Sequence, residues 1–240
     1  MRMDALSRSL ALLHAWVLPW RCLLCGAAGS GGLDLCGACA AELPRNTSCC
    51  ARCALPLPGA TALCGGCQRK PPPWHTAWAP FRYGWPLDRL EARYKFGRDL
   101  AAGRTLARLW QRVPPPLARP ALILPVPLHR ARLRRRGYNQ ALELARPLGR
   151  ALDVPVRHDA LLRSRATAAQ TELDAAARRR NVRGAFALRE GIALPAHVAL
   201  LDDVMTTGAT LAECTRVLRR AGVARVDVWA LARAPSPRGR

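Results

Sequence analysis

The sequence predicts an α/β protein in which a small cysteine-rich region precedes a larger domain with a mainly parallel sheet and flanking helices. Two observations carry this prediction. Cys-x-x-Cys pairs recur at a regular spacing between residues 22 and 67, and from residue 74 onward short apolar stretches alternate with helical patterns. The chain has 240 residues, half of them hydrophobic, which is enough material for both parts.

Residues 1–20 are expected to form an amphipathic helix that packs on the rest of the chain. Arg2 and Arg8 precede an apolar run, a pattern also typical of a cleaved signal peptide, which is the alternative. His14 interrupts the run, however, and a Cys-x-x-Cys pair follows it at once. No apolar run reaches the length of a membrane helix. We therefore expect a cytoplasmic protein whose cysteines do not form disulfides.

Eight cysteines form four Cys-x-x-Cys pairs whose first members are 14 residues apart. Each pair holds two thiolates on a tight turn, and two pairs supply the four sulfurs that tetrahedral zinc requires. Glycines and prolines fill the gaps and leave little to build a core, so metal is expected to hold these turns. The sequence predicts a double zinc ribbon over residues 21–70 with two structural Zn²⁺ ions. Their predicted ligands are Cys22, Cys25, Cys36, Cys39, Cys50, Cys53, Cys64 and Cys67.

The spacing leaves the pairing of the four turns open. Consecutive turns would give two successive ribbons, and an interleaved arrangement is the alternative. Cys49 could replace Cys50 as a ligand, although the period favours Cys50, and Cys214 is expected to be a small buried apolar residue. Three prolines in the segment 68–73 are expected to set the ribbons apart from the larger domain, predicted at residues 74–235.

Helical patterns and short apolar stretches alternate in the larger domain. Continuous apolar stretches are typical of strands buried on both faces, as in a parallel sheet between helices. Pro147 is expected to kink or break the helix that contains it. Helices are expected at 87–96, 100–110, 139–152 and 209–221, with a charged helix ending the segment 171–182, and strands at 121–127, 185–188, 198–201 and 226–231.

The expected strand 198–201 ends in two adjacent carboxylates, Asp202 and Asp203, and a loop rich in hydroxyl groups follows. Ligands of parallel sheets bind beyond the carboxyl ends of the strands. The next helix offers free N–H groups and its positive dipole end to a phosphate, and Gly208 lets the backbone approach closely. Because two carboxylates can hydrogen-bond a diol, the run predicts a site for a ribose 5-phosphate.

This run resembles the motif with which type I phosphoribosyltransferases bind 5-phosphoribosyl 1-diphosphate (PRPP). Together with the cysteine pairs, it resembles the ComF family of competence-related, phosphoribosyltransferase-like proteins over nearly the whole chain. The other motifs that carry the resemblance are Tyr94-Lys95-Phe96-Gly97, Pro125-Val126-Pro127-Leu128-His129, Arg136-Gly137-Tyr138-Asn139-Gln140, Thr167 with Gln170, and Arg180-Asn181-Val182-Arg183-Gly184-Ala185-Phe186.

The resemblance implies a type I phosphoribosyltransferase-like fold and a PRPP site. It implies that Asp202 and Asp203 bind the ribose hydroxyls, and that residues 163–183 form a lid over the site. The loop after the strand at 121–127 would face pyrophosphate, with which Mg²⁺ would arrive. The residues implied around the 5-phosphate are Met205, Thr206, Thr207, Gly208, Ala209 and Thr210, and the pyrophosphate candidates are His129, Arg134, Arg135 and Arg136.

One departure from the family pattern leaves catalysis open. In purine-salvage relatives, the position of Thr206 is an aspartate that acts as a general base, which a threonine hydroxyl cannot do at neutral pH. The resemblance therefore implies either a phosphoribosyltransferase with an unknown acceptor, or a non-catalytic protein of the DNA-uptake machinery that responds to PRPP.

The distribution of charge predicts an anionic partner. The chain carries a net charge of +22, and residues 89–183 alone carry 22 basic and 7 acidic side chains, a net charge of +15. Single-stranded DNA, gripped by the ribbons and this middle region, is therefore a second expected partner. Nearby aromatic side chains would either stack on bases or pack at the domain junction; they are Trp74, Trp78, Phe81, Tyr83 and Trp85.

Overall fold

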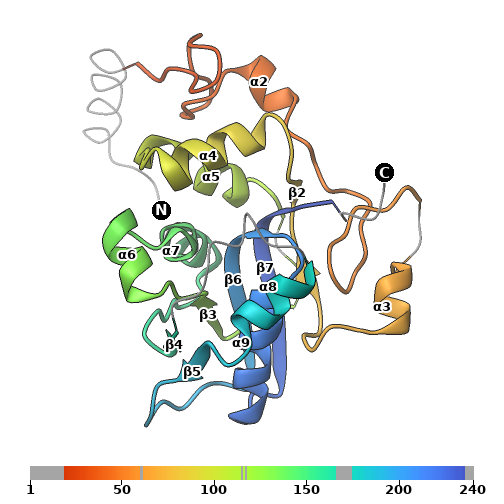
Figure 1. Ribbon diagram of the computed structural model, residues 1–240. Coiled ribbons are helices and arrows are strands. Elements are labelled where there is room, and N and C mark those ends of the chain that lie inside the picture. Colours follow the sequence, from red (N-terminus) through yellow and green to blue (C-terminus); the bar gives the residue numbers. More distant parts are fainter. Residues whose placement is uncertain (1–18, 60–61, 115, 117, 166–174, 236–240) are drawn as a thin grey trace.

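A computed structural model describes residues 19–59, 62–114, 116, 118–165 and 175–235 (Figure 1). It confirms a mainly parallel sheet with flanking helices. The expected helix at 1–20 lies almost wholly outside the described residues, and so does the centre of the expected lid, with Thr167 and Gln170. No helix among the described residues is both long enough and apolar enough to cross a membrane.

The main sheet has the strand order β1-β7-β6-β3, and β2 pairs with β7 as well, all in parallel. Ala77 lies opposite Val228 and Phe81 opposite Ala232, so β1 and β2 follow the same edge of β7 in one continuous register. Pro80, which has no N–H to donate, lies between them. The strands are β1 (Ala77–Trp78), β2 (Phe81–Arg82), β3 (Leu122–Pro125), β6 (His197–Met205) and β7 (Arg225–Arg233).

Short extended segments cover both outer edges of this sheet. Beside β2, the N–H of Arg82 donates to the carbonyl of Pro44 at 2.8 Å, and the N–H of Asn46 donates to the carbonyl of Pro80 at 2.9 Å. Beside β3, the N–H of Ile123 donates to the carbonyl of Pro155 at 2.9 Å. The segment that covers β2 is the connection between the two cysteine-rich ribbons.

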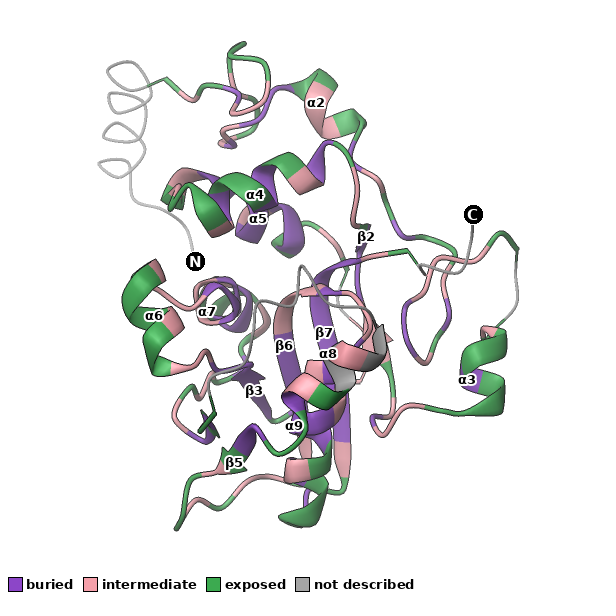
Figure 2. Cartoon of the chain, viewed as in Figure 1, coloured by how far each residue is buried: buried purple, intermediate pink, exposed green. Residues whose placement is uncertain are grey.

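Two apolar cores lie on the two faces of the sheet. Alternate residues of β6 and β7 point to opposite cores, because successive side chains of a strand face opposite ways. Helices α4, α5 and α7 pack on one face, and α9 packs on the other, so the central strands are buried on both sides (Figure 2). The helices of the larger domain are α4 (Leu87–Phe96), α5 (Leu100–Gln111), α6 (Arg130–Arg136), α7 (Gln140–Leu152), α8 (Ala175–Val182) and α9 (Ala209–Arg220).

Three local expectations need correction. Pro147 does not break its helix: α7 is continuous through it, and its carbonyl accepts a hydrogen bond from Gln111 Nε2 at 2.7 Å, which ties α7 to α5. The expected strand at 185–188 does not join the main sheet. It forms β5 (Phe186–Leu188), which pairs antiparallel with β4 (Leu161–Arg163). The strand expected to end at Leu201 continues to Met205, so β6 includes both aspartates.

The two ribbons repeat one backbone pattern with an offset of 28 residues. An antiparallel bridge joins Arg21 to Ala28 in the first ribbon and Cys49 to Pro56 in the second. Each ribbon ends in one short helix, α2 (Gly37–Ala41) or α3 (Gly65–Arg69). The first ribbon shares an apolar core with α4 and α5, and the second shares the other core with Trp74 and α9. The prolines of 68–73 therefore do not keep the ribbons out of contact with the larger domain.

Most of the aromatic cluster packs inside the protein. Trp74 and Phe81 are buried, and the Trp78 ring lies edge-on to Trp229 with 5.3 Å between centroids. Trp85, in contrast, is 59% exposed. The expectation of packing at the junction thus holds for Trp74, Trp78 and Phe81.

Candidate functional site

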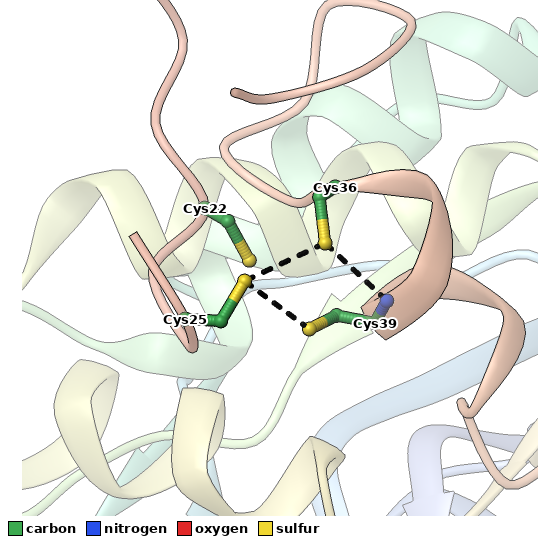
Figure 3. A group of neighbouring side chains, drawn as sticks. All are labelled: Cys22, Cys25, Cys36 and Cys39. Carbon is green, nitrogen blue, oxygen red and sulfur yellow. Dashed lines mark hydrogen bonds between the residues drawn. The ribbon is translucent and has the colours of Figure 1, made fainter. Parts of the chain in front are cut away.

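The eight cysteines form two groups of four: Cys22, Cys25, Cys36 and Cys39, and Cys50, Cys53, Cys64 and Cys67. All sulfurs of a group lie within 4.8 Å of one another. In the first group, the Cys25 sulfur is 3.6 Å from that of Cys36 and 3.8 Å from that of Cys39 (Figure 3). A zinc tetrahedron with bonds of about 2.3 Å has sulfur–sulfur edges of about 3.8 Å. Both groups fit a structural zinc ion, and the pairing of consecutive turns is confirmed.

Backbone N–H groups favour negatively charged sulfur at the first cysteine of each group, Cys22 and Cys50. Burial alone would raise the pKa of the Cys22 thiol, but backbone N–H groups of Cys36, Cys25 and Leu24 outweigh burial and lower the pKa to about 6. A hydrogen bond with the Cys36 sulfur raises the pKa of Cys39 because it favours the protonated thiol, and repulsion by the Cys22 thiolate adds to the rise. A bound dication removes that repulsion. Cys49 belongs to neither group, and Cys214 is fully buried, as expected.

Asp202 and Asp203 lie at the carboxyl end of β6, where a parallel sheet presents its ligand site. The N–H of Asp203 donates to Asp202 Oδ1 at 2.9 Å, and the N–H of Val204 donates to Asp203 Oδ1 at 2.6 Å. Burial raises the pKa of Asp202 well above its ordinary value, and the adjacent charge of Asp203 raises it further. The two acids therefore form a compact acidic pair whose backbone contacts fix its orientation.

Lys95 of α4 reaches this pair, although sequence reasoning gave it no role. Its ammonium nitrogen lies 3.1 Å from Asp203 Oδ2 and 3.2 Å from Oε2 of Glu91, one helical turn away. Burial opposes the charge on Lys95, but Asp203 and Glu91 outweigh burial and raise its pKa. Two features of the sequence pointed to this residue. Glu91 and Lys95 have the i, i+4 spacing of a helical ion pair, and lysine is rare, since Lys70 is the other lysine in the chain.

Thr206, Thr207 and Gly208 form the loop between β6 and α9, here called the threonine loop. Gly208 has φ = +72°, and a Cβ at this position would lie 2.8 Å from Cη2 of Trp74, so both conformation and space require glycine. Thr207 Oγ1 accepts a hydrogen bond from the N–H of Ala209 at 3.3 Å. The loop thus leads directly into the first turn of α9, whose N–H groups have no carbonyl partner within the helix.

The residues that the resemblance places around a 5-phosphate differ in how far they are buried. The side chains of Thr206, Thr207 and Thr210 lie only partly within the core, since all three residues are half-buried. Met205 and Ala209 are buried and contribute side chains to the core of α9, which leaves only their backbone for a ligand.

The segment between β3 and α7 lies at the same edge of the sheet, because β3 pairs in parallel with β6. His129 caps α6, its Nδ1 accepting the N–H of Ala131 at 3.3 Å. Arg134 and Arg135 are exposed and Arg136 is half-buried. Tyr138, which follows α6, stacks on Tyr94 with 5.2 Å between ring centroids. The structure thus holds the arginine-rich helix next to α4, the helix that carries Lys95.

Arg233, which sequence reasoning also missed, lies behind the threonine loop. Its Nη1 donates to the carbonyl of Met205 at 3.1 Å and to that of Thr206 at 2.5 Å, and its Nε donates to the carbonyl of Cys53 at 3.0 Å. Nothing in the local sequence distinguishes this arginine from the many others, since its partners are distant along the chain.

The fold and the site define a protein in which a double zinc ribbon precedes an α/β domain of the phosphoribosyltransferase-like class. A family model described as "Double zinc ribbon domain" matches residues 13–68. DNA utilization protein YhgH of Escherichia coli O157:H7 is 38% identical over 225 residues, which cover 90% of this chain and 96% of that protein.

Two competence proteins are also similar. Competence protein F of Haemophilus influenzae is 43% identical over 157 residues, 62% of this chain and 69% of that protein. Competence protein ComFC of Streptococcus pneumoniae is 25% identical over 154 residues, 64% of this chain and 66% of that protein. The chain belongs to the ComF family.

Proposed function

We propose that this chain binds PRPP at the carboxyl end of β6, transfers its phosphoribosyl group to an acceptor, and serves in DNA uptake. The observation that carries the proposal is the position of Asp202 and Asp203 directly before the threonine loop and the N-terminus of α9. Groups that can accept hydrogen bonds from a diol are thus followed, within a few residues, by groups that can donate hydrogen bonds to a phosphate. The link to DNA uptake rests on the names of the relatives, which refer to competence and DNA utilization.

In this proposal, the two aspartates accept hydrogen bonds from the 2- and 3-hydroxyls of the ribose. Each carboxylate oxygen can accept two hydrogen bonds, so the contact of Asp203 Oδ2 with Lys95 leaves capacity for a hydroxyl. The hydroxyls of Thr206 and Thr207, with the N–H groups at the start of α9, hold the 5-phosphate. Lys95 offsets part of the acidic charge that would otherwise repel an anionic ligand.

The diphosphate of PRPP then points toward α6 and the arginines Arg134, Arg135 and Arg136, with His129 at the start of the helix. Mg²⁺ arrives with the diphosphate and offsets its charge. In the transfer, the bond between the anomeric carbon and the diphosphate oxygen breaks, and its electron pair stays on the diphosphate. A nitrogen acceptor forms the new bond to carbon and releases its proton to solvent. The chain's own contribution is to fix geometry and charge.

Calorimetry with PRPP and Mg²⁺ tests the binding step. Hydrogen bonds to a charged group contribute about 1.5–3 kcal/mol each, so Asp203→Asn should weaken PRPP binding at least tenfold while the fold survives. Thr207→Val, which removes one hydroxyl at nearly constant volume, should also weaken it. Asp159→Asn, at a half-buried acid paired with Arg157, is the matched control and should bind as the wild type does. No heat of binding to the wild type, or equal affinity of Asp203→Asn, would refute the proposal.

Pyrophosphate release in the presence of candidate nitrogen acceptors tests the transfer step. If the protein binds PRPP but releases no pyrophosphate with any acceptor, it is a PRPP-binding protein and not a phosphoribosyltransferase. This outcome is informative because Thr206 cannot act as a general base.

A second candidate function, binding of single-stranded DNA, is favoured by the exposed arginines of α6. Affinity should fall steeply with salt, because bound phosphates release counterions. Replacing Arg134, Arg135 and Arg136 by alanine should weaken binding for all sequences alike and reduce the salt slope by about 2, since each phosphate contact on a single strand contributes about 0.7. The control replaces three exposed arginines elsewhere: Arg189, Arg216 and Arg220. Equal losses in both triple variants would exclude α6 as the binding surface.

A further inference from the structure

One buried arginine joins the second ribbon to the threonine loop. Arg233, at the end of β7, is 7% exposed. Its Nε donates to the carbonyl of Cys53, one of the second group of four cysteines, at 3.0 Å. Its Nη1 donates to the carbonyls of Met205 and Thr206, at 3.1 and 2.5 Å, and to that of Ala234 at 2.5 Å. A single guanidinium therefore fixes the backbone of the ribbon turn relative to the start of the loop.

A buried tryptophan makes a second link between the same two parts. Trp74 Nε1 donates to the carbonyl of Arg52, inside the turn that carries Cys50 and Cys53, at 2.6 Å. The other end of its ring packs against Gly208, so closely that a Cβ there would lie 2.8 Å from Cη2. Both links depend on backbone carbonyls of one Cys-x-x-Cys turn, at positions 52 and 53.

The first ribbon has different partners. Arg93 of α4 donates to the carbonyl of Leu23 at 2.6 Å, and Arg112, next to α5, donates to that of Gly31 at 2.5 Å. The buried cysteines Cys22 and Cys36 lie in the core that contains α4 and α5. Figure 1 shows α2 above α4 and α5, with α3 on another side of the molecule. The two groups of four cysteines thus offer the same ligands, but the ribbons that carry them contact different parts of the larger domain.

We infer that the second zinc ribbon, acting through Arg233 and Trp74, sets the conformation of the threonine loop, whereas the first ribbon does not. The turn at 50–53 has little apolar material of its own, so bound metal fixes the carbonyls of Arg52 and Cys53. When those carbonyls lose their position, Arg233 and Trp74 lose hydrogen-bond acceptors, and the loop loses its support. Arg233 is thus a positioning residue for phosphate binding; this consequence rests on the proposed function.

Equivalent cysteines in the two ribbons provide the first test, in the full-length chain. Cys36 and Cys64 occupy the same place in the repeat, at the N-termini of α2 and α3. Cys36→Ala and Cys64→Ala should each lose one zinc ion. Hydrogen exchange of the amides of residues 206–209 should accelerate at least tenfold in Cys64→Ala and change less than twofold in Cys36→Ala. Equal acceleration in both variants, or none in Cys64→Ala, would overturn the inference.

Arg233 variants provide a second test that leaves every zinc ligand in place. Arg233→Met keeps the length of the side chain and removes its donors, so it should retain two zinc ions while exchange at 206–209 accelerates. Arg233→Lys, which restores one cationic donor, should recover part of the protection. Arg225→Met, on the same strand at its other end, is the control. Unchanged exchange at 206–209 in Arg233→Met would overturn the role of Arg233.

Calorimetry with PRPP and Mg²⁺ links this coupling to the ligand. Cys64→Ala and Arg233→Met should bind at least tenfold more weakly than the wild type, and Cys36→Ala and Arg225→Met should bind within twofold of it. If the wild type binds no PRPP, the proposed function fails, but the exchange comparison still decides whether the second ribbon holds the loop. If PRPP binds equally to all variants, the positioning role is wrong although the proposed function stands.

Discussion

The ammonium nitrogen of Lys95 lies 3.1 Å from Oδ2 of Asp203, which joins helix α4 to the carboxyl end of β6. The same nitrogen lies 3.2 Å from Glu91, which is fully buried. Three carboxylates, Glu91, Asp202 and Asp203, therefore gather around one lysine. The site depends on that lysine for charge balance.

Removing the lysine should destabilise the protein because it leaves buried acids without a cation. Breaking a buried ion pair from one side costs about 3–5 kcal/mol. Since the Lys95 side chain is 19% exposed, we expect Lys95→Met to lower the free energy of unfolding by about 3 kcal/mol at neutral pH, as measured by urea denaturation. Adding Glu91→Gln should restore part of this loss, because the amide needs no cation. Strictly additive effects of the two substitutions would show that Lys95 and Glu91 do not interact.

Glu91 should make stability fall as pH rises toward neutrality. Burial raises its pKa from 4.5 to about 7; Lys95 and Arg136 oppose the rise, and Asp203 adds to it. The folded protein thus binds this proton more tightly than the unfolded chain, so the stabilisation is complete below pH 4.5 and is lost as pH approaches 7. In Glu91→Gln the decline over this range should be smaller by roughly 3 kcal/mol, from 1.36 kcal/mol per pKa unit. The free energy of unfolding is measured by urea denaturation across pH 4–8. Parallel curves for the wild type and Glu91→Gln would show that Glu91 does not cause the decline.

Gly208→Ala should destabilise the protein more than the same change at Gly191. Both glycines have positive φ, +72° and +73°, so alanine pays a conformational cost of about 1 kcal/mol at either site. At Gly191 a Cβ meets nothing within 4 Å, whereas at Gly208 it meets Trp74. Thermal unfolding should therefore show at least twice the loss for Gly208→Ala, with weaker PRPP binding only in that variant. Equal losses would mean that the Trp74 ring moves aside without cost.

Metal analysis of the reduced, full-length protein should find two zinc ions per chain, released on denaturation with a chelator. Fewer than two would refute the assignment of one ion to each group of four cysteines. Cys22→Ser should lower the melting temperature of α4 and α5 along with that of the first ribbon, because Cys22 lies in the core that contains those helices. A larger domain that melts as in the wild type would show that this shared core contributes little.

Features encoded within a few neighbouring residues could be predicted from the sequence. The zinc ligands follow from a 14-residue period, and the aspartate pair and the threonine loop lie in one short run. Lys95 lies in one of the motifs, but its contact with Asp203 could not be found in this way, and neither could the contacts of Arg233, because the partners come from distant parts of the chain. Arg233 and Cys53, for example, are 180 residues apart. The break expected as one alternative at Pro147 does not occur, because packing of α7 against α5 outweighs the hydrogen bond that proline removes.

The short connection between the ribbons, residues 44–46, has a protective consequence. An uncovered outer strand offers its N–H and C=O groups to other chains and so promotes aggregation. Here the backbone of Pro44 and Asn46 bonds to the outermost part of the sheet, at Arg82 and Pro80. Because both ribbons anchor this connection, we expect loss of their metal to free this edge for pairing with another copy of the chain. Removal of zinc should then promote aggregation as well as unfold the ribbons.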